Sequence, residues 1–324
     1  YSYLRMKHCC RVCWCSIFCC ICCHKTPLNV INEETKLLPK NDATRNEIEL
    51  EELYVFGSAP QELRNNLLEA YGRKPVKKIV LGKSHCLILL NNNNTLIGFC
   101  SNEDGQLGLD LKTKICNRIK NIPITLQNIG DIQNMEISDI AAGEDFSLVL
   151  LKNAEEQPIL IRFGIDIMNK YVDIPNTLTQ KVEKIPEGIE NISHIFAFEK
   201  RIMFYTNSNE IYVGGRDFMG TEINEYKLLK KLYNAIENIY MLKESCIVLD
   251  TNNQIFGLGD NSYKELGLGS MNNINEFHKL GFKFNKKIRK ISTGARHILF
   301  LLENGELYCV GDNSEGQCCG ATSN

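Results

Sequence analysis

The chain has 324 residues, of which 44% are hydrophobic, with a formal net charge of -2 and a sequence pI near 6.4. This charge excludes the strongly basic surface by which proteins bind the phosphates of nucleic acids, so we expect no nucleic-acid partner. The length and the apolar fraction are sufficient for one large packed domain.

The first segment, residues 1–25, is predicted to be a cysteine-rich membrane anchor. Apolar and aromatic residues separate its cysteines, and Lys7, Arg11 and Lys25 flank them. Clustered thiols of this kind are typical of S-acylated anchors at a cytoplasmic membrane surface. The predicted lipidation sites are Cys9, Cys10, Cys13, Cys15, Cys19, Cys20, Cys22 and Cys23.

Two other interpretations of this segment stay open. Cys10-x-x-Cys13 and Cys19-x-x-Cys22 have the spacing of metal ligands, although adjacent cysteines allow several registers. The run 12–23 is long enough for the apolar region of a secretory signal, but no small-x-small cleavage site follows it.

The other seven cysteines are scattered along the chain. Cys86, Cys246 and Cys309 fall in strand-like runs, where a thiol packs as a small apolar group. This distribution fits a reducing compartment better than a disulfide scaffold, and we therefore expect a cytoplasmic, membrane-associated protein.

Residues 26–50 are polar and are predicted to form a disordered linker. Within them Glu33, Leu37 and Leu38 match an acidic di-leucine pattern, which resembles sorting signals that adaptor proteins recognise. Residues 51–324 form the third predicted region.

The organising unit of this third region is clearest at residues 288–320. Two apolar runs, 297–302 and 307–310, flank the pair Asn304-Gly305. An Asn-Gly pair between apolar runs indicates a β-hairpin. Glycines before the first run and after the second supply turns, so the unit is a bend, a strand, a hairpin turn, a strand and a second turn.

The unit recurs with starts at residues 76, 137, 192, 236 and 288, and residues 53–57 match its second half alone. Five complete units and one half therefore predict an all-β repeat fold with blades of a β-propeller. The repeated signature residues are Gly82, His85, Gly105, Gln106, Gly108, Gly143, Gly164, Gly215, Gly259, Gly294, His297, Gly311 and Gly316.

The glycine signature, an apolar strand after Gly-x-x-His, and the run 102–108 resemble the repeats of the regulator of chromosome condensation family. The resemblance covers roughly residues 53–320 and implies a β-propeller, usually with seven blades, whose members mostly serve as interaction platforms. Cys100 and Cys319 replace two signature glycines, and the units that begin at 192 and 236 lack the Gly and His of the bend.

Three structural expectations follow from the units. Helical spacing of apolar residues predicts short helices at 61–71 and 222–233. Gly82, Gly143 and Gly294 are expected to hold backbone conformations unfavourable to other residues. Five and a half units fall short of a seven-bladed ring. Either the half unit at 53–57 therefore completes the last blade across the seam, or the chain is a fragment. Closure of the ring would remove exposed sheet edges.

The sequence contains no phosphate loop, no His-Glu-x-x-His pair and no Gly-x-Ser-x-Gly turn. His85 and His297 occupy equivalent repeat positions, which favours structural roles, and Asp260 and Asp312 recur as turn formers. We therefore expect no catalytic residue, metal site or cofactor in the propeller.

The leading functional hypothesis is a non-enzymatic protein-protein interaction platform at a cytoplasmic membrane surface. The alternative, implied by the resemblance, is guanine-nucleotide exchange on a small GTPase, with a wedge supplied by the turn 152–158 or the connection 109–134. A chromatin-associated role is opposed by the near-neutral charge and the anchor.

Overall fold

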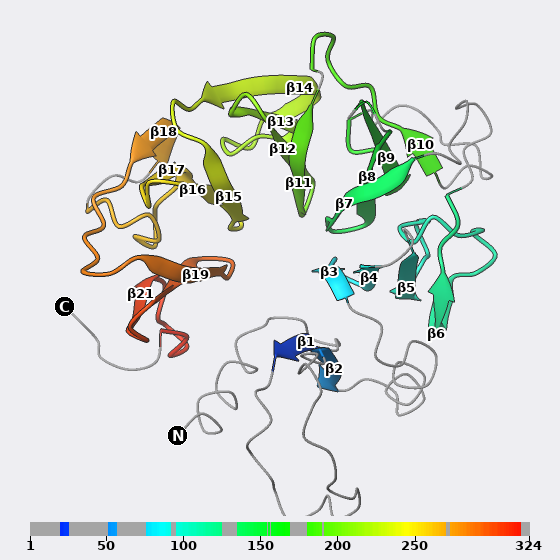
Figure 1. Cartoon of the computed structure of the whole chain (residues 1–324), viewed down its shortest axis with the longest axis horizontal. Helices are drawn as coiled ribbons and strands as arrows, with labels where there is room; N and C mark the ends of the chain where they lie inside the picture. Colours follow the sequence, from blue (N-terminus) through cyan, green and yellow to red (C-terminus); the bar gives the residue numbers. More distant parts are fainter. Residues whose placement is uncertain are drawn as a thin grey trace, which may run out of the picture.

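The computed structural model describes residues 20–25, 51–56, 76–91, 95–124, 135–153, 155, 157–168, 180–189, 191–269 and 273–318. Within these ranges all regular elements are strands, and they form five consecutive antiparallel sheets and one separate strand pair. Figure 1 shows the five sheets arranged as blades around a common centre. The predicted all-β propeller is confirmed.

Each blade follows the chain from its innermost strand outward. The first blade contains β3 (Val76–Leu81), β4 (His85–Leu90), β5 (Leu96–Ser101) and β6 (Ile115–Asn121). The second contains β7 (Glu136–Ala142), β8 (Phe146–Lys152), β9 (Pro158–Gly164) and β10 (Gln180–Val182). The third contains β11 (Ile192–Phe198), β12 (Arg201–Thr206), β13 (Glu210–Arg216) and β14 (Glu222–Lys231). The fourth contains β15 (Ile236–Met241), β16 (Ser245–Asp250), β17 (Ile255–Asp260) and β18 (Asn273–Lys279), and the fifth contains β19 (Ile288–Thr293), β20 (His297–Leu302) and β21 (Leu307–Gly311).

The apolar runs of the sequence become the second strands of the blades. All residues of β4, β12 and β16 are buried, and β12 and β16 lie between a blade before them and a blade after them. A strand covered on both faces reads as a continuous apolar run rather than an alternating one. Four hydrophobic clusters fill the four junctions between consecutive blades.

The innermost strands β3, β7, β11, β15 and β19 lie nearest the centre in Figure 1, and consecutive members of this set contact one another. Each has a register shift near its start, as between Val76 and Lys78 in β3 and between Ile137 and Asp139 in β7. This repeated β-bulge places one equivalent residue of every blade at the same point of the inner wall.

The helix predicted at 222–233 is wrong, because β14 occupies this stretch as the outer strand of its blade. Register shifts insert extra residues opposite β13, so the buried Tyr226 and the half-buried Ile223 and Leu229 recur every third residue. A bulged edge strand thus imitates helical spacing. The second predicted helix, 61–71, lies outside the described residues. The connection 109–134 contains β6.

The half unit does not complete the last blade in this structure. β2 (Glu51–Phe56) instead pairs antiparallel with β1 (Cys20–Lys25). The fifth blade therefore has three described strands where the other four have four. The described part of the chain contains no helix with the length and apolar character needed to cross a membrane.

Candidate functional site

One end of every blade carries both the bend between its first two strands and the turn after its third strand. We call this end of the propeller the signature face. The residue after each third-strand glycine position donates its backbone N–H to the carbonyl of the bend, as Asp312 does to Arg296 at 2.9 Å and Asp260 to Glu244 at 2.8 Å. The same bond joins Ser101 to Ser84 at 2.9 Å. Bend and turn are thereby held together as one rigid corner.

The third-strand signature glycines have a backbone reason for being glycine. Gly164, Gly215, Gly259 and Gly311 have φ between 81° and 109°, where other residues are strained. A Cβ at each would also lie 2.3–2.5 Å from a bend carbonyl oxygen. Cys100, which replaces this glycine in the first blade, keeps the same backbone with φ of 76°.

The bend glycines have a different reason, and the predicted backbone strain at Gly82, Gly143 and Gly294 is wrong. None of the three has a positive φ. The ring three residues later lies over each glycine, so that a Cβ would be 2.1 Å from a ring atom of His85, Phe146 and His297 respectively. These positions are small because the ring occupies their space.

The turn after the third strand is stabilised by side chains that recur from blade to blade. The amide oxygens of Asn102, Asn261 and Asn313 accept the backbone N–H five residues later at 2.7–2.9 Å. Gln106 Oε1 accepts Asp104 N at 3.0 Å, as Gln317 accepts Glu315. Gly105 and Gly316 have φ of 78° and 74°, and Gly108 has φ of 66°. The Asp260 and Asp312 carboxylates accept the N–H two residues on, which confirms them as turn formers.

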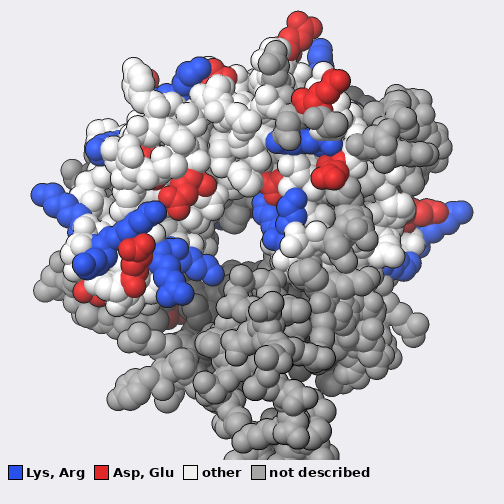
Figure 2. All heavy atoms as spheres, in the orientation of Figure 1, with Lys and Arg blue, Asp and Glu red and all other residues white. Residues whose placement is uncertain are grey.

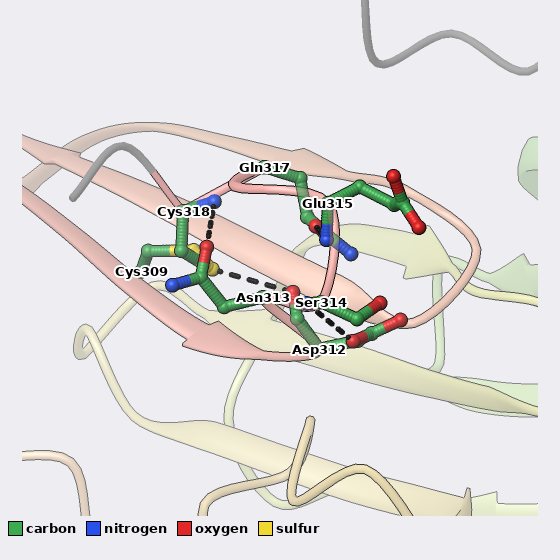
Figure 3. Close-up of a disulfide and its surroundings, with 7 residues drawn as sticks. All are labelled: Cys309, Asp312, Asn313, Ser314, Glu315, Gln317 and Cys318. Atoms are coloured by element: carbon green, nitrogen blue, oxygen red, sulfur yellow. Dashed lines mark hydrogen bonds between the residues drawn. A yellow bond between two sulfur atoms is a disulfide. The ribbon is translucent and has the colours of Figure 1, made fainter. Parts of the chain in front are cut away.

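The turn of the fifth blade contains a disulfide that the sequence did not predict (Figure 3). Cys309 of β21 bonds to Cys318 with a Cα–Cα distance of 5.4 Å, so its interpretation as a packed thiol is wrong. In the fourth blade the equivalent positions are Gly257 and Leu266, and a Cβ at Gly257 would lie 3.2 Å from the leucine side chain. Two positions packed this closely place a pair of cysteines within bonding distance. Cys86 and Cys246 are buried thiols as expected.

The signature histidine joins neighbouring blades. His85 Nε2 lies 2.7 Å from the Ser147 hydroxyl of the second blade, and that hydroxyl donates to the Gln106 carbonyl at 2.8 Å. Burial lowers the pKa of His85 to about 4, so the ring is neutral near pH 7. This placement supports the structural role expected for the histidine.

The third blade uses arginine for the same purpose. The buried Arg201 guanidinium donates to the carbonyls of Arg216 and Asp217 in its own blade and to Lys243 in the next, at 2.9–3.0 Å. It also stacks on the Phe218 ring at 4.2 Å. A cation enclosed by carbonyls and an aromatic ring fastens the third blade to the fourth.

A cavity of about 500 Å³ lies at the centre, lined by residues of β3, β7, β11 and β15. Figure 2 shows Lys and Arg side chains on two sides of this central opening. Described basic residues of the first and fifth blades include Lys77 and Lys78 on β3, and Arg289 and Lys290 on β19. Charge at the centre is therefore distributed unevenly around the ring.

Asp139 is the buried charge of this inner wall, and sequence reasoning missed it. Its carboxylate accepts Lys78 Nζ of the first blade at 2.6 Å, and His194 Nδ1 and Ile195 N of the third blade, both at 3.1 Å. Burial opposes the ionised form, but the bonds from His194 and Lys78 outweigh it and lower the pKa of Asp139. One carboxylate thereby ties three consecutive blades together.

The bends also bond to one another around the opening. Lys83 N donates to Glu144 O at 3.3 Å, Glu144 N to Glu199 O at 2.8 Å, and Lys243 N to Ala295 O at 3.0 Å. The backbone is thus fixed while the side chains differ in charge from blade to blade. The signature face is a rigid frame carrying a varied surface, which is the arrangement of a recognition site.

All signature residues predicted from the sequence lie on this frame. The predicted lipidation sites do not: Cys20, Cys22 and Cys23 lie in β1, and the other five cysteines are outside the described residues. The predicted sorting residues Glu33, Leu37 and Leu38 are also outside them. The turn 152–158 lies at the opposite end of its blade, where Asn153 Oδ1 accepts Glu155 N and Gln157 N at 3.0 and 2.9 Å.

Comparison with known proteins finds similarity to one family. The profile of the regulator of chromosome condensation (RCC1) repeat matches residues 288–317. The mouse (Mus musculus) E3 ubiquitin-protein ligase HERC2 is 23% identical over 271 residues, which is 80% of this chain but 5% of the ligase. The dog (Canis lupus familiaris) X-linked retinitis pigmentosa GTPase regulator is 38% identical over 65 residues, which is 20% of this chain and 6% of that protein.

Solved structures give the same fold. Prp20p of Saccharomyces cerevisiae, described with its binding properties to Gsp1p and histones, superposes with a TM-score of 0.63 at 18% identity, over 78% of this chain and 60% of that chain. Human WBSCR16 superposes with a TM-score of 0.60 at 16% identity, over 74% of this chain and 63% of that chain. This chain thus spans 5% and 6% of the two relatives named above and about three fifths of these two structures.

Proposed function

Because the chain belongs to the regulator of chromosome condensation repeat family, we propose that its propeller is a non-enzymatic platform that binds a protein partner through the signature face. The observation that carries this proposal is the backbone bonding of the bends, which holds Lys83, Glu144, Glu199 and Lys243 in fixed positions around the central opening. A preorganised surface loses little conformational entropy on binding, so it suits recognition of a folded partner.

Charge reversal on the signature face tests the platform. Lys200 is exposed in the bend of the third blade, whereas Lys286 is exposed at the opposite end of the propeller, where Glu303 N bonds to the neighbouring Lys287 O. We expect Lys200→Glu to weaken capture of protein partners from lysate and Lys286→Glu to leave it unchanged. Equal capture by both variants and the unmodified chain would contradict binding through this face.

The alternative function is guanine-nucleotide exchange on a small GTPase. It is favoured by the fold shared with Prp20p, which is described with its binding to Gsp1p, and by the segment similar to a GTPase regulator. Exchange factors hold their GTPase most tightly when it is empty of nucleotide. The test is retention of purified Gsp1p by the chain in EDTA and its release by excess GDP. Retention that does not depend on nucleotide supports the platform alone.

The proposal includes tethering of the propeller to a cytoplasmic membrane surface by residues 1–25. Its support is the cluster of eight cysteines flanked by Lys7, Arg11 and Lys25. One acyl chain gives only marginal membrane binding, so stable anchoring needs at least two, and the cluster offers that redundancy. The basic residues add attraction to an anionic leaflet of about 1 kcal/mol each.

Fractionation of cells tests the tether. Replacing Cys19, Cys20, Cys22 and Cys23 together with serine is expected to move the protein from the membrane pellet to the soluble fraction, as is hydroxylamine treatment of the unmodified protein. Single replacements are expected to have little effect. A quadruple variant that stays in the pellet, or zinc bound stoichiometrically to the segment, would contradict the tether.

A further inference from the structure

The connection between the fourth and fifth blades carries a concentration of positive charge. Residues 283–290 contain five basic side chains, all of them exposed: Lys283, Lys286, Lys287, Arg289 and Lys290. In Figure 2 Lys and Arg side chains gather over β19, to the left of the central opening. We call the three lysines that precede β19, namely Lys283, Lys286 and Lys287, the basic patch.

Stacked aromatic rings hold this connection against the core. The Phe282 and Phe284 rings lie 5.9 Å apart, and their centroids are 5.0 and 5.1 Å from the Phe300 ring of β20. Both rings pack on the hydrophobic cluster that fills the junction of the fourth and fifth blades, while Lys283 between them is exposed. Because both sides of this junction are described blades, the position of the patch is set within this chain.

Backbone bonds fix the other end of the patch. Lys287 O accepts the Glu303 N–H at 3.0 Å, and the next residue, Ile288, donates its N–H to Asn253 Oδ1 at 3.1 Å. From here β19 runs to the bend at Gly294, which lies on the signature face. The patch therefore projects from a fixed backbone at the end of the propeller opposite the signature face.

The patch has little negative charge around it within the described part of the chain. Lys231, another exposed lysine, pairs with Glu210 at 3.1 Å, but no patch lysine forms an ion pair with a described residue. The adjacent hairpin turn holds two carboxylates, Glu303 and Glu306, and the second of them accepts the Tyr308 hydroxyl at 3.0 Å. Five basic residues against two carboxylates leave this corner of the propeller positively charged.

The chemistry of lysine indicates the kind of ligand. An ammonium group is a mobile point charge, without the planar fork by which arginine binds one phosphate through two hydrogen bonds. Three exposed lysines therefore suit a surface that presents many phosphates better than a single enclosed ligand. Anionic membranes attract such residues, and because the attraction falls off within a Debye length it acts only on the face of a protein nearest to the lipid.

A membrane fits this patch better than a nucleic acid does. The proposed tether at residues 1–25 would hold the propeller near a cytoplasmic leaflet, which raises the effective concentration of lipid headgroups at the patch. A nucleic acid offers similar phosphates, but nothing in the proposed function holds it near the propeller, and the formal net charge of -2 opposes its approach.

We propose that Lys283, Lys286 and Lys287 bind the anionic phospholipid headgroups of a membrane, so that the propeller lies with this end on the lipid and its signature face towards the cytosol. This inference rests on the proposed tether and adds which side of the propeller meets the membrane. The signature face, at the other end, then stays accessible to a protein partner.

Vesicle sedimentation tests the patch with the full chain, purified without acyl groups. We expect the chain to bind vesicles of phosphatidylcholine with phosphatidylserine more tightly than vesicles of phosphatidylcholine alone. The triple variant Lys283→Glu, Lys286→Glu and Lys287→Glu is expected to bind the mixed vesicles at least about tenfold more weakly, because three attractive charges become repulsive. Arginine at the same three positions is expected to preserve binding, since it keeps the charge.

Controls restrict the effect to this end of the propeller and to lipid. Lys200→Glu on the signature face is expected to leave vesicle binding unchanged, and circular dichroism checks the fold of each variant. Equal binding of mixed vesicles by the triple glutamate variant and the unmodified chain would overturn the inference. So would tighter binding of a fluorescent DNA duplex that depends on the same lysines, or displacement of the vesicles by inorganic phosphate at the concentration of the lipid.

Failure of this inference is distinguishable from failure of the tether. The vesicle assay uses a chain without acyl groups, whereas the tether is measured by the hydroxylamine sensitivity of the membrane pellet from cells. A hydroxylamine-sensitive pellet, together with a triple glutamate variant that binds vesicles normally, would keep the tether and remove the patch.

Discussion

Gly294 and His297 share one volume: a Cβ on Gly294 would lie 2.1 Å from the Cε1 atom of the His297 ring. The fourth blade solves the same packing problem in reverse. There Leu242 takes the glycine position and Ser245 takes the ring position, while the backbone bond from Leu242 N to Ser245 O, 2.8 Å, matches the 2.9 Å bond from Gly294 N to His297 O. The larger side chain of the pair thus lies at the second position in the fifth blade and at the first position in the fourth, while the backbone of the bend is the same in both.

This exchange predicts the outcome of a double-mutant cycle. Gly294→Leu alone is expected to lower the free energy of unfolding by about 2 to 3 kcal/mol, because the new side chain overlaps the ring. Adding His297→Ser is expected to restore most of that loss, since it recreates the pair of the fourth blade. Urea denaturation of the three variants measures the coupling. Additive losses would show that the two positions do not share space.

Cys100 provides the second prediction, because it has the positive φ of 76° that the other blades assign to glycine. The left-handed backbone costs a residue with a Cβ about 1 to 2 kcal/mol, and glycine loses part of that gain through its greater freedom in the unfolded chain. Cys100→Gly is therefore expected to raise the free energy of unfolding by about 0.5 to 1 kcal/mol.

The matched control reverses the change in the fourth blade. Gly259→Cys places a Cβ where it would lie 2.3 Å from the Glu244 carbonyl oxygen, and it is expected to destabilise the chain by about 1 to 3 kcal/mol. Denaturation midpoints with unchanged slopes measure both effects. A destabilised Cys100→Gly variant would mean that the thiol makes contacts worth more than the relief of backbone strain.

The sequence predicted the propeller because each repeated letter has a local cause. The third-strand glycines are required by a positive φ, and the bend glycines are required because a ring lies over them. Asparagines such as Asn313 accept a backbone N–H within the same turn. Because these interactions join residues only a few positions apart, the same residue types recur at fixed spacing and can be recognised in a single sequence. The bend glycines were found even though the reason first given for them was wrong.

The features that were missed depend on residues from different blades. Lys78, Asp139 and His194 occupy one repeated position with three different side chains, so no recurring letter marks the network that they form. The disulfide between Cys309 and Cys318 arises where other blades pack leucine on glycine, which is a spatial relationship rather than a motif. A repeated sequence pattern predicts the local geometry of one blade, whereas these contacts depend on how neighbouring side chains pack in three dimensions.

The third prediction is a pH dependence of stability from His85. Its pKa is 6.5 ordinarily and about 4 in the folded chain, because the ring is buried. Between these values the unfolded chain binds a proton that the folded chain does not, so the free energy of unfolding decreases as the pH falls, by about 3 kcal/mol in total. His85→Phe, patterned on Phe146, is expected to remove this part of the dependence. Urea denaturation at pH 7 and pH 4 measures it, and equal losses in both proteins would contradict a buried neutral His85.

The last prediction concerns Asp139 as the tie between three blades. Asp139→Asn removes the ion pair with Lys78 and weakens the bonds with His194, while an amide still accepts Ile195 N. Breaking a fully buried pair costs about 3 to 5 kcal/mol, but the Lys78 and His194 side chains are 34% and 54% exposed, so we expect a loss of about 1 to 3 kcal/mol. Because the pKa of Asp139 is lowered by folding, its contribution is present above the ordinary aspartate pKa and is lost as the pH falls through the folded value. The difference in the free energy of unfolding between Asp139→Asn and the unmodified chain is therefore expected to be largest near pH 7 and to shrink in acid. A difference that stays constant with pH would show that the carboxylate charge is not what joins the blades.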